Sequence, residues 1–162
     1  MLTYRKMSLF DAPSGSILVH ACNALGIWGH GIAVEFKNRF PEAHYKHVEF
    51  CTQFRYSPER ILGLAQFILP SSDCPYGIGN LIVSKGFSAT KSSPKEILEY
   101  TSSALRDLCL KIVYTDYSKY GQWPVYSNKF NSGLFGVPWE ESEKILKTAL
   151  EGTYLDWTVC SL

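Results

Sequence analysis

Short apolar runs, separated by polar or glycine-bearing segments, recur along the chain and predict β-strands. Runs of this length bounded by turn residues are typical of strands that are buried on both faces of a sheet. We expect strands at residues 2–6, 17–21, 61–69, 81–84, 124–127 and 154–159. The strand at residues 2–6 is expected to extend through Leu9 and Phe10.

Apolar positions three and four residues apart predict helices between these strands. The clearest helix begins at Ser93-Pro94-Lys95-Glu96, with an N-cap serine, a proline at the first helical position and a glutamate that completes a capping box. Other helices are expected at about 31–40, from Pro41 onward and from Pro138-Trp139 onward. Residues 114–123 are polar, aromatic and irregular, which predicts a surface insertion.

The alternation of strands and helices predicts an α/β fold, a three-layer α/β/α sandwich with a central mixed sheet. The runs at 61–69 and 81–84 are expected to form an antiparallel hairpin, which makes the sheet mixed. The chain of 162 residues is 46% apolar and 19% charged. These values are typical of one globular domain, so we expect residues 1–162 to form a single domain.

A glycine-rich segment joins the expected strand 17–21 to the first expected helix. This first loop, Gly26-Ile27-Trp28-Gly29-His30-Gly31, contains three glycines, which allow positive φ and close approach of a ligand to the backbone. The free N–H groups of the helix's first turn favour an anion there. The loop predicts a phosphate-binding site, with a tight structural turn as the alternative. Its glycine spacing differs from the Gly-x-Gly-x-x-Gly of dinucleotide-binding folds.

A second loop, Asn131-Ser132-Gly133-Leu134-Phe135-Gly136, also follows an expected strand and precedes an expected helix. Two such loops at strand ends of one sheet face each other across a crevice, where open α/β sheets bind ligands. Phe135 is expected either to pack on a sugar or to join the core.

Charge and cysteine content narrow the classes of partner. The net charge of +1 gives no basic surface for general nucleic-acid binding. No apolar run approaches the roughly twenty residues of a membrane span, and the first residues lack the apolar core of a signal peptide. Five scattered cysteines without a Cys-x-x-Cys pair favour reduced thiols in the cytosol or nucleus. We expect a monomer that binds a small anionic molecule.

Both loops resemble those of the macrodomain family, whose members bind ADP-ribose between two such segments. Residues 20–33 match the family's first segment, and residues 131–138 match its second. More closely, His-Ala-Cys-Asn followed by Trp-Gly-x-Gly-Ile-Ala, and Asn-Ser-Gly-Leu-Phe-Gly-Val-Pro-Trp, look like the fungal ADP-ribose 1″-phosphate phosphatase subfamily. The resemblance implies removal of the 1″-phosphate from ADP-ribose 1″-phosphate, a by-product of tRNA splicing, without a cofactor.

The resemblance also implies roles for matched positions. Main-chain N–H groups of residues 29–31 would hold one phosphate, and those of residues 132–135 the other end, including the 1″-phosphate. Asn23 would contact the distal ribose. The implied ligand-binding residues are Ser8, Leu9, Ala21, Asn23, Gly29, His30, Gly31, Ile32, Asn131, Ser132, Gly133, Leu134, Phe135 and Gly136.

Two matched positions depart from the family's pattern. Ser8 stands where many macrodomains carry an aspartate that recognises the amino group of adenine, and a hydroxyl is a weaker partner for that amine. His30 replaces a glycine that is common in the first loop, which adds a titratable group close to the phosphates.

Common phosphatase nucleophiles are missing from the expected places. Trp28 follows Cys22 by six residues, so there is no Cys-x₅-Arg loop, and Asp11 is not part of an Asp-x-Asp pair. Hydrolysis therefore needs a positioned water and stabilisation by loop amides. His20, at a strand end, is the first candidate to deprotonate or orient this water, and His30 is a second candidate as an acid. The alternatives are a hydrogen-bonded structural histidine and a histidine at the rim.

Two further chemistries have weaker support. Lys85 lies near the position of a nucleophilic lysine in one glycohydrolase branch of the family, but Phe135 stands where that branch has an acid. His44, His47 and Cys51 have a spacing that can hold zinc, although an amphipathic helix explains the same spacing. We expect a surface lysine and no metal. Functional alternatives are a non-catalytic ADP-ribose-binding module and a hydrolase of protein-linked mono-ADP-ribose.

Overall fold

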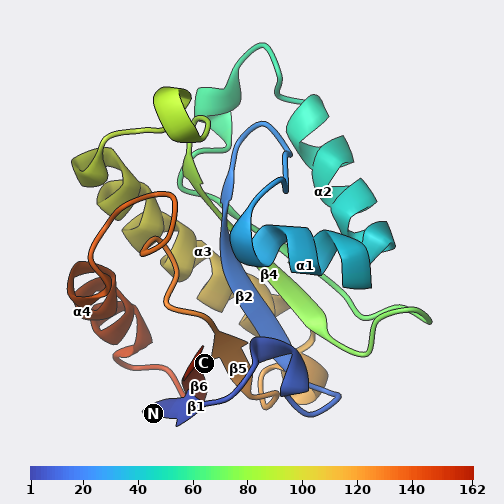
Figure 1. Ribbon diagram of the computed structural model, residues 1–162. Helices are drawn as coiled ribbons and strands as arrows, with labels where there is room; N and C mark the ends of the chain where they lie inside the picture. Colours follow the sequence, from blue (N-terminus) through green and yellow to red (C-terminus); the bar gives the residue numbers. More distant parts are fainter.

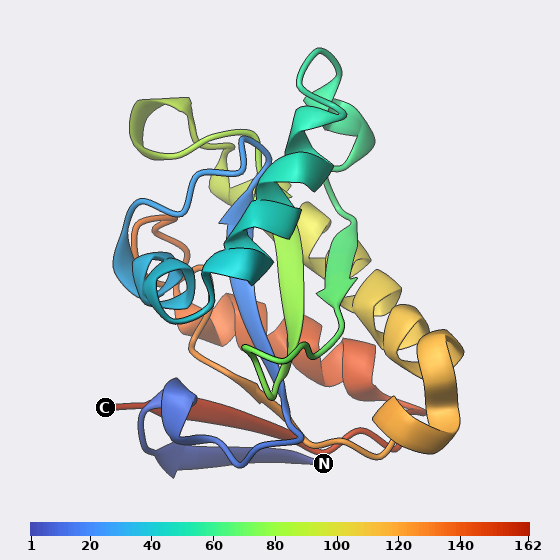
Figure 2. The same ribbon diagram turned by 90° about the vertical axis from the view of Figure 1, so that its right-hand side faces the viewer.

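The computed structural model describes the backbone of residues 1–162 and every side chain except that of Tyr117. A six-stranded sheet lies between two layers of helices (Figure 1 and Figure 2). The strands are β1 Leu2–Lys6, β2 Ile17–Asn23, β3 Ala65–Ile68, β4 Gly77–Ser84, β5 Val125–Ser127 and β6 Trp157–Ser161. The α-helices are α1 Gly31–Arg39, α2 Pro41–Thr52, α3 Pro94–Tyr120 and α4 Trp139–Leu150, and the 3₁₀ helices are η1 Leu9–Asp11, η2 Pro58–Arg60 and η3 Ser88–Thr90.

The strand order across the sheet is β1-β6-β5-β2-β4-β3. β3 runs antiparallel to β4, and the other neighbouring strands pair in parallel. The predictions of a mixed sheet, of the antiparallel pair and of the three-layer sandwich are therefore confirmed. No helix in the described residues has both the length and the apolar character to cross a bilayer.

Both faces of the sheet are buried, which explains the apolar run Ile17-Leu18-Val19 at the start of β2. Ile17 and Val19 pack in one core with side chains of α3 and α4, whereas Leu18 packs in the other with Phe36 of α1. Successive side chains of a strand point to opposite faces, so a strand covered on both sides is mostly apolar, and a buried polar side chain such as His20 needs a hydrogen-bond partner.

Helix α3 begins as predicted but continues further. Its capping box is formed: the Ser93 N–H donates to Glu96 Oε1 at 3.0 Å, and the Glu96 N–H donates to Ser93 Oγ at 3.2 Å. The predicted insertion at 114–123 is wrong as far as Tyr120, because the helix resumes after an extended residue at Asp116 (φ −171°, ψ 91°). Helix propensity alone did not reveal that residues 114–120 belong to a longer helix that is interrupted at Asp116.

Several strand boundaries also differ from the prediction. β3 begins at Ala65, because residues 61–64 form a turn in which Gly63 has φ +82°, a conformation no strand contains. β4 starts at Gly77, four residues before the expected strand at 81–84. Leu9 and Phe10 belong to η1 and do not extend β1, and β6 begins at Trp157.

The connections that follow β2 and β5 run to opposite faces of the sheet. These strands are parallel neighbours, so their carboxyl ends lie at the same edge. β2 leads into α1 on one face, and β5 leads towards α4 on the other. Such a switch point leaves a crevice outside the strand ends, and this is where open α/β sheets bind ligands.

Gly79, in the centre of β4, offers a test of core packing. A Cβ at this position would lie 2.9 Å from Leu108 Cδ2 and 3.1 Å from Val19 Cγ2. We expect Gly79→Ala to lower the free energy of unfolding by about 1–3 kcal/mol, as overpacking of a core does. Leu108→Ala alone is expected to cost about 2–5 kcal/mol by leaving a cavity.

The double variant is expected to lose less than the sum of the two, because the added methyl fills part of that cavity. Urea denaturation of the four proteins measures the coupling. Strict additivity would contradict this account of the packing between β4 and α3.

Candidate functional site

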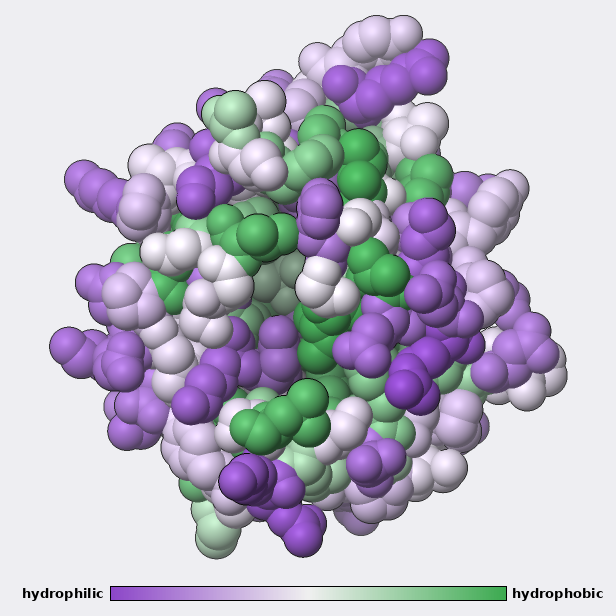
Figure 3. Space-filling view, in the orientation of Figure 1, coloured by the Kyte–Doolittle hydropathy of each residue, from purple (hydrophilic) through white to green (hydrophobic). Residues whose placement is uncertain are grey.

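A cleft lies at the carboxyl ends of β2 and β5, between the first and second loops. It encloses about 730 Å³, including the space at its mouth that is open to solvent. Figure 3 shows this face hollowed near its centre, with apolar side chains along the margin. The lining residues are Ala21, Cys22, Asn23, Ile27, Trp28, Gly29, His30, Gly31, Ile32, Ala33, Phe87, Asn128, Lys129, Phe130, Asn131, Gly133, Leu134 and Phe135.

The first loop presents the start of α1 to the cleft. His30 is the N-cap of this helix, but its side chain makes no capping hydrogen bond. Gly31 follows with φ +58°, and a Cβ placed on it would meet no atom within 4 Å. The loop thus places a side-chain-free backbone and the unpaired N–H groups of a helix terminus in one wall of the cleft, an arrangement that binds anions.

Asn23 and Gly26 hold the first loop in shape. The Asn23 side chain donates from Nδ2 to the Ile27 carbonyl and accepts from the Leu25 N–H, both at 2.9 Å. Gly26 has φ +76°, and a Cβ there would lie 3.3 Å from Cβ of Cys51 on α2. Glycine is therefore required at position 26 by backbone conformation and by the close approach of α2.

The buried side-chain amide of Asn131 holds the base of the second loop in place. Asn131 has φ +69°, and its Nδ2 donates to Thr101 Oγ1 of α3 at 2.9 Å and to Ser142 Oγ of α4 at 3.1 Å. Gly133, by contrast, faces open space, since a Cβ there would meet nothing within 4 Å. The loop is held at its base by Asn131 and has an uncovered backbone at Gly133, as a backbone anion site requires.

The structure brings most of the predicted site residues together. Of these, Ala21, Asn23, Gly29, His30, Gly31, Ile32, Asn131, Gly133, Leu134 and Phe135 line one cleft. Ser132 and Gly136 lie in the second loop but outside the lining. No aspartate or glutamate is among the described residues that line the cleft, so no fixed negative charge opposes a phosphate.

Ser8 and Leu9 are not brought to the cleft. Ser8 is the N-cap of η1, where its Oγ accepts the Phe10 N–H at 3.3 Å. The Leu9 side chain is buried in the core between the sheet and α1. Both side chains therefore have structural roles at η1, a short helix that the sequence pattern did not predict.

His20 lies beneath the first loop with no access to the cleft. Its side chain is fully buried, its Nε2 lies 2.7 Å from Asn80 Oδ1, and its ring stacks on Phe36 with centroids 4.0 Å apart. Burial, reinforced by the neighbouring His47, lowers the pKa of His20 to about 3. This corrects the expectation that His20 meets a catalytic water, because a buried, paired imidazole reaches neither water nor substrate.

A chain of side-chain hydrogen bonds continues from His20 across the sheet. Asn80 Nδ2 donates to Gln66 Oε1 at 3.2 Å, and the same oxygen lies 2.9 Å from Nδ1 of His47 on α2. Burial lowers the pKa of His47 to about 4. The network connects β2, β4, β3 and α2 below the first loop.

The Cys22 thiol of the cleft lining is also affected by burial. Burial raises its pKa well above the ordinary value, so this cysteine is a poor nucleophile.

The zinc and lysine alternatives receive no support from the geometry. His44 Nε2 lies 3.3 Å from the Gly26 carbonyl, and His47 is paired with Gln66. In the described part of the chain, no group of three histidine, cysteine, aspartate or glutamate side chains is placed to hold a metal ion. Lys85 is exposed and lies outside the cleft lining.

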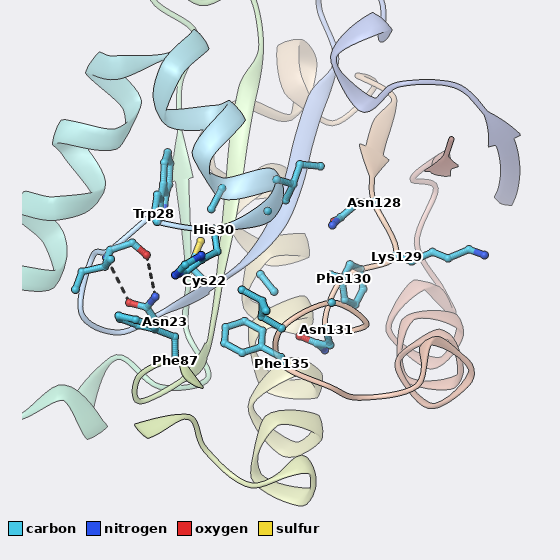
Figure 4. Close-up of a pocket in the computed structure, with 18 residues that line it drawn as sticks. Cys22, Asn23, Trp28, His30, Phe87, Asn128, Lys129, Phe130, Asn131 and Phe135 are labelled. Atoms are coloured by element: carbon cyan, nitrogen blue, oxygen red, sulfur yellow. Dashed lines mark hydrogen bonds between the residues drawn. The ribbon is translucent and has the colours of Figure 1, made fainter. Parts of the chain in front are cut away.

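Several lining residues were not predicted from the sequence. Phe87 follows the end of β4, whereas Asn128, Lys129 and Phe130 follow β5. Their positions in the sequence could have indicated them, because residues just past the carboxyl ends of neighbouring parallel strands gather at a switch point. Figure 4 shows Asn23 and Phe87 at one end of the cleft and Asn128 at the other, with the Lys129 side chain directed away from it.

The buried histidines make stability depend on pH. The unfolded chain binds a proton at each imidazole below about pH 6.5, whereas the folded chain resists protonation of His47 down to about pH 4 and of His20 to about pH 3. Between these limits the free energy of unfolding should fall as the pH falls, by about 1.4 kcal/mol per pH unit for each histidine.

We expect His20→Gln to make the free energy of unfolding less dependent on pH, by about 1.4 kcal/mol per pH unit, which is the contribution of one proton. Urea denaturation between pH 7 and pH 4 measures this slope. Asn38→Ala, on the exposed surface of α1, is the control. Identical slopes for the wild type and His20→Gln would show that His20 already binds a proton in the folded protein.

Comparison with known proteins agrees with the fold and the family. No family model matches the chain. The macrodomain of Mycobacterium tuberculosis DarG superposes with a TM-score of 0.79 and 25% identity, covering 100% of this chain and 98% of that one. Thermosipho africanus DarTG in complex with ADP-ribose superposes with a TM-score of 0.70 at 15% identity, covering 95% of this chain and 39% of that one.

Two fungal relatives are similar over almost the whole sequence. An ADP-ribose 1″-phosphate phosphatase of Chaetomium globosum is 35% identical over 155 residues, covering 90% of this chain and 82% of the relative. One of Meyerozyma guilliermondii is 35% identical over 161 residues, covering 90% and 92%. The resemblance inferred from the two loops is confirmed: the chain has a macrodomain fold and belongs to the ADP-ribose 1″-phosphate phosphatase family.

Proposed function

We propose that this protein hydrolyses ADP-ribose 1″-phosphate to ADP-ribose and inorganic phosphate. The observation that carries the proposal is a pair of glycines, Gly31 and Gly133, whose missing side chains leave open space on opposite walls of one cleft. A ligand with phosphates at two places suits this pair of backbone sites. The names of the fungal relatives support the same substrate.

The cleft suggests how such a ligand is oriented. The N–H groups at the start of α1 hold one phosphate and those of the second loop hold another, because each wall offers main-chain donors without a side chain. The distal ribose lies towards Asn23 and Phe87, which share one end of the cleft (Figure 4). The nucleoside then extends towards the opposite end.

The reaction proceeds by attack of a water molecule on the phosphorus atom of the 1″-phosphate. The new bond forms between the water oxygen and phosphorus, and the bond between phosphorus and the 1″ oxygen breaks. The leaving oxygen needs a proton, and loop amides stabilise the charge on the phosphoryl oxygens. Among the described residues that line the cleft, His30 carries the only imidazole, which makes it our candidate acid.

A non-catalytic ADP-ribose-binding module is the second candidate function. The burial of His20 favours it, since the cleft then offers few groups able to transfer a proton. For either function we further propose a monomer in the cytosol or nucleus, and for the enzyme a role with the by-product of tRNA splicing. All five cysteines are free and buried, which suits a reducing compartment.

Phosphate release from ADP-ribose 1″-phosphate, measured beside calorimetric binding of ADP-ribose, separates the two functions. We expect wild type to bind ADP-ribose and to release phosphate. Gly133→Val should fold normally, because its side chain enters open space, yet weaken binding by about tenfold or more by filling the cleft. Binding without release would identify a binding module, and unaltered binding by Gly133→Val would exclude the second loop from the site.

His30→Ala tests the proposed acid. We expect kcat to fall by about 100-fold or more, as loss of a general acid does, with the Kd of ADP-ribose changed less than about threefold. Asn38→Ala on the same helix is the matched control, since it is exposed and outside the cleft. If His30→Ala keeps the wild-type kcat, the proton must come from elsewhere.

A further inference from the structure

The following inference rests on the proposed function. A protein that binds ADP-ribose 1″-phosphate selectively needs a group that recognises the base of this nucleotide. The serine in the position of the family's adenine-binding aspartate is occupied, because Ser8 Oγ caps η1. Neither Ser8 nor Leu9 lines the cleft. Selectivity for a base therefore requires another polar side chain within the cleft wall.

Asn128 is a polar side chain of this kind with unused hydrogen-bonding capacity. It directly follows β5 and lines the cleft. Its Oδ1 is buried and has no hydrogen-bond partner among the described residues. Leaving a buried amide oxygen unpaired costs roughly 1–3 kcal/mol, so the position is favourable for a ligand that donates a hydrogen bond.

Ser127, which precedes Asn128, and Phe130, two residues after it, are anchored in the core. The intervening Lys129 is exposed. Ser127 Oγ accepts the indole N–H of Trp157 at 2.9 Å in the interior. Phe130 is 1% exposed and packs edge-on against Trp139, with ring centroids 5.1 Å apart. These contacts hold the backbone at Asn128 in place relative to the cleft.

Two other buried side-chain atoms of the lining have no partner among the described residues, Trp28 Nε1 and Asn131 Oδ1. Trp28 Nε1 can only donate. Asn131 already uses its amide nitrogen on Thr101 and Ser142, so neither side chain offers a free acceptor and a free donor together.

The amide at the opposite end of the cleft is also engaged. There the Asn23 side chain already bonds to the Ile27 carbonyl and the Leu25 N–H. Figure 4 places Asn23 and Asn128 on opposite sides of the space between the two loops. With the phosphates held between the loops, the nucleoside lies at the end where a hydrogen-bonding edge finds a free partner.

We propose that Asn128 recognises the adenine base of the substrate through its 6-amino group. Rotation of the Asn128 amide about its terminal side-chain bond brings Oδ1, which is buried in this structure, to the amine. Oδ1 then accepts a hydrogen bond from the amine, and Nδ2 donates to the adjacent ring nitrogen. An asparagine amide matches adenine in this two-bond manner, and each such pair discriminates against the wrong base by about 1–3 kcal/mol. A base without the amine leaves Oδ1 unpaired, whereas a ribose hydroxyl satisfies only one of the two amide atoms.

The test compares ADP-ribose with its analogue in which hydrogen replaces the 6-amino group of the base. Calorimetry gives both dissociation constants for wild type, Asn128→Ala, Asn128→Asp and the control Asn38→Ala. We expect wild type and Asn38→Ala to prefer ADP-ribose by about tenfold or more. Asn128→Ala should bind the two ligands with nearly equal affinity, and Asn128→Asp should keep the preference because it keeps the acceptor oxygen.

The outcomes separate this inference from the proposed function. If wild type binds ADP-ribose but shows no preference, or if Asn128→Ala keeps the full preference, Asn128 does not recognise the amine, and the phosphatase proposal is unaffected. If Asn128→Ala weakens both ligands equally, the amide pairs with the ribose, and the inference is likewise overturned. If wild type binds neither ligand, both the inference and the proposed function fail.

Discussion

The divergence of the connections after β2 and β5 is the constraint on which the site depends. Two parallel neighbours end at one edge of the sheet, and their chains must leave towards opposite helical layers. Neither connection can cover the gap between the strand ends, so a cleft remains there. The first turn of α1 opens into this gap, where its N–H groups have no partner within the helix. An anionic ligand supplies the missing acceptors.

The two loops combine a rigid base with an open tip. Asn23 ties the first loop to itself, and Asn131 ties the second loop to α3 and α4. At the tips, Gly31 and Gly133 leave the backbone uncovered. Backbone donors bind phosphate well only when they are held in position before the ligand arrives. The polar side chains at the bases therefore serve the function without contacting the reacting atoms.

The buried histidine network places titratable groups where they stabilise structure and take no part in chemistry. His20 and His47 remain neutral because burial disfavours their charged forms, and each is hydrogen-bonded through an amide of the sheet. The cleft itself contains one imidazole and no carboxylate among its described lining residues. Such a lining binds anions readily but offers few proton-transfer groups, which is why the proposed mechanism assigns proton transfer to His30 and charge stabilisation to the loop amides.

The sequence alone determined the layer architecture, both loops and the family, because apolar periodicity and glycine placement are local properties of the chain. It also located the capping box of α3, whose partners are three residues apart. Local pattern could not locate the burial of His20, which depends on Phe36 and Asn80 approaching from other elements. The same holds for η1, in which Ser8 is the N-cap and not part of the cleft lining, and for Asn128, an ordinary loop residue until β5 pairs beside β2. Contacts between residues far apart in sequence decide which polar groups face the ligand, and only the tertiary structure specifies those contacts.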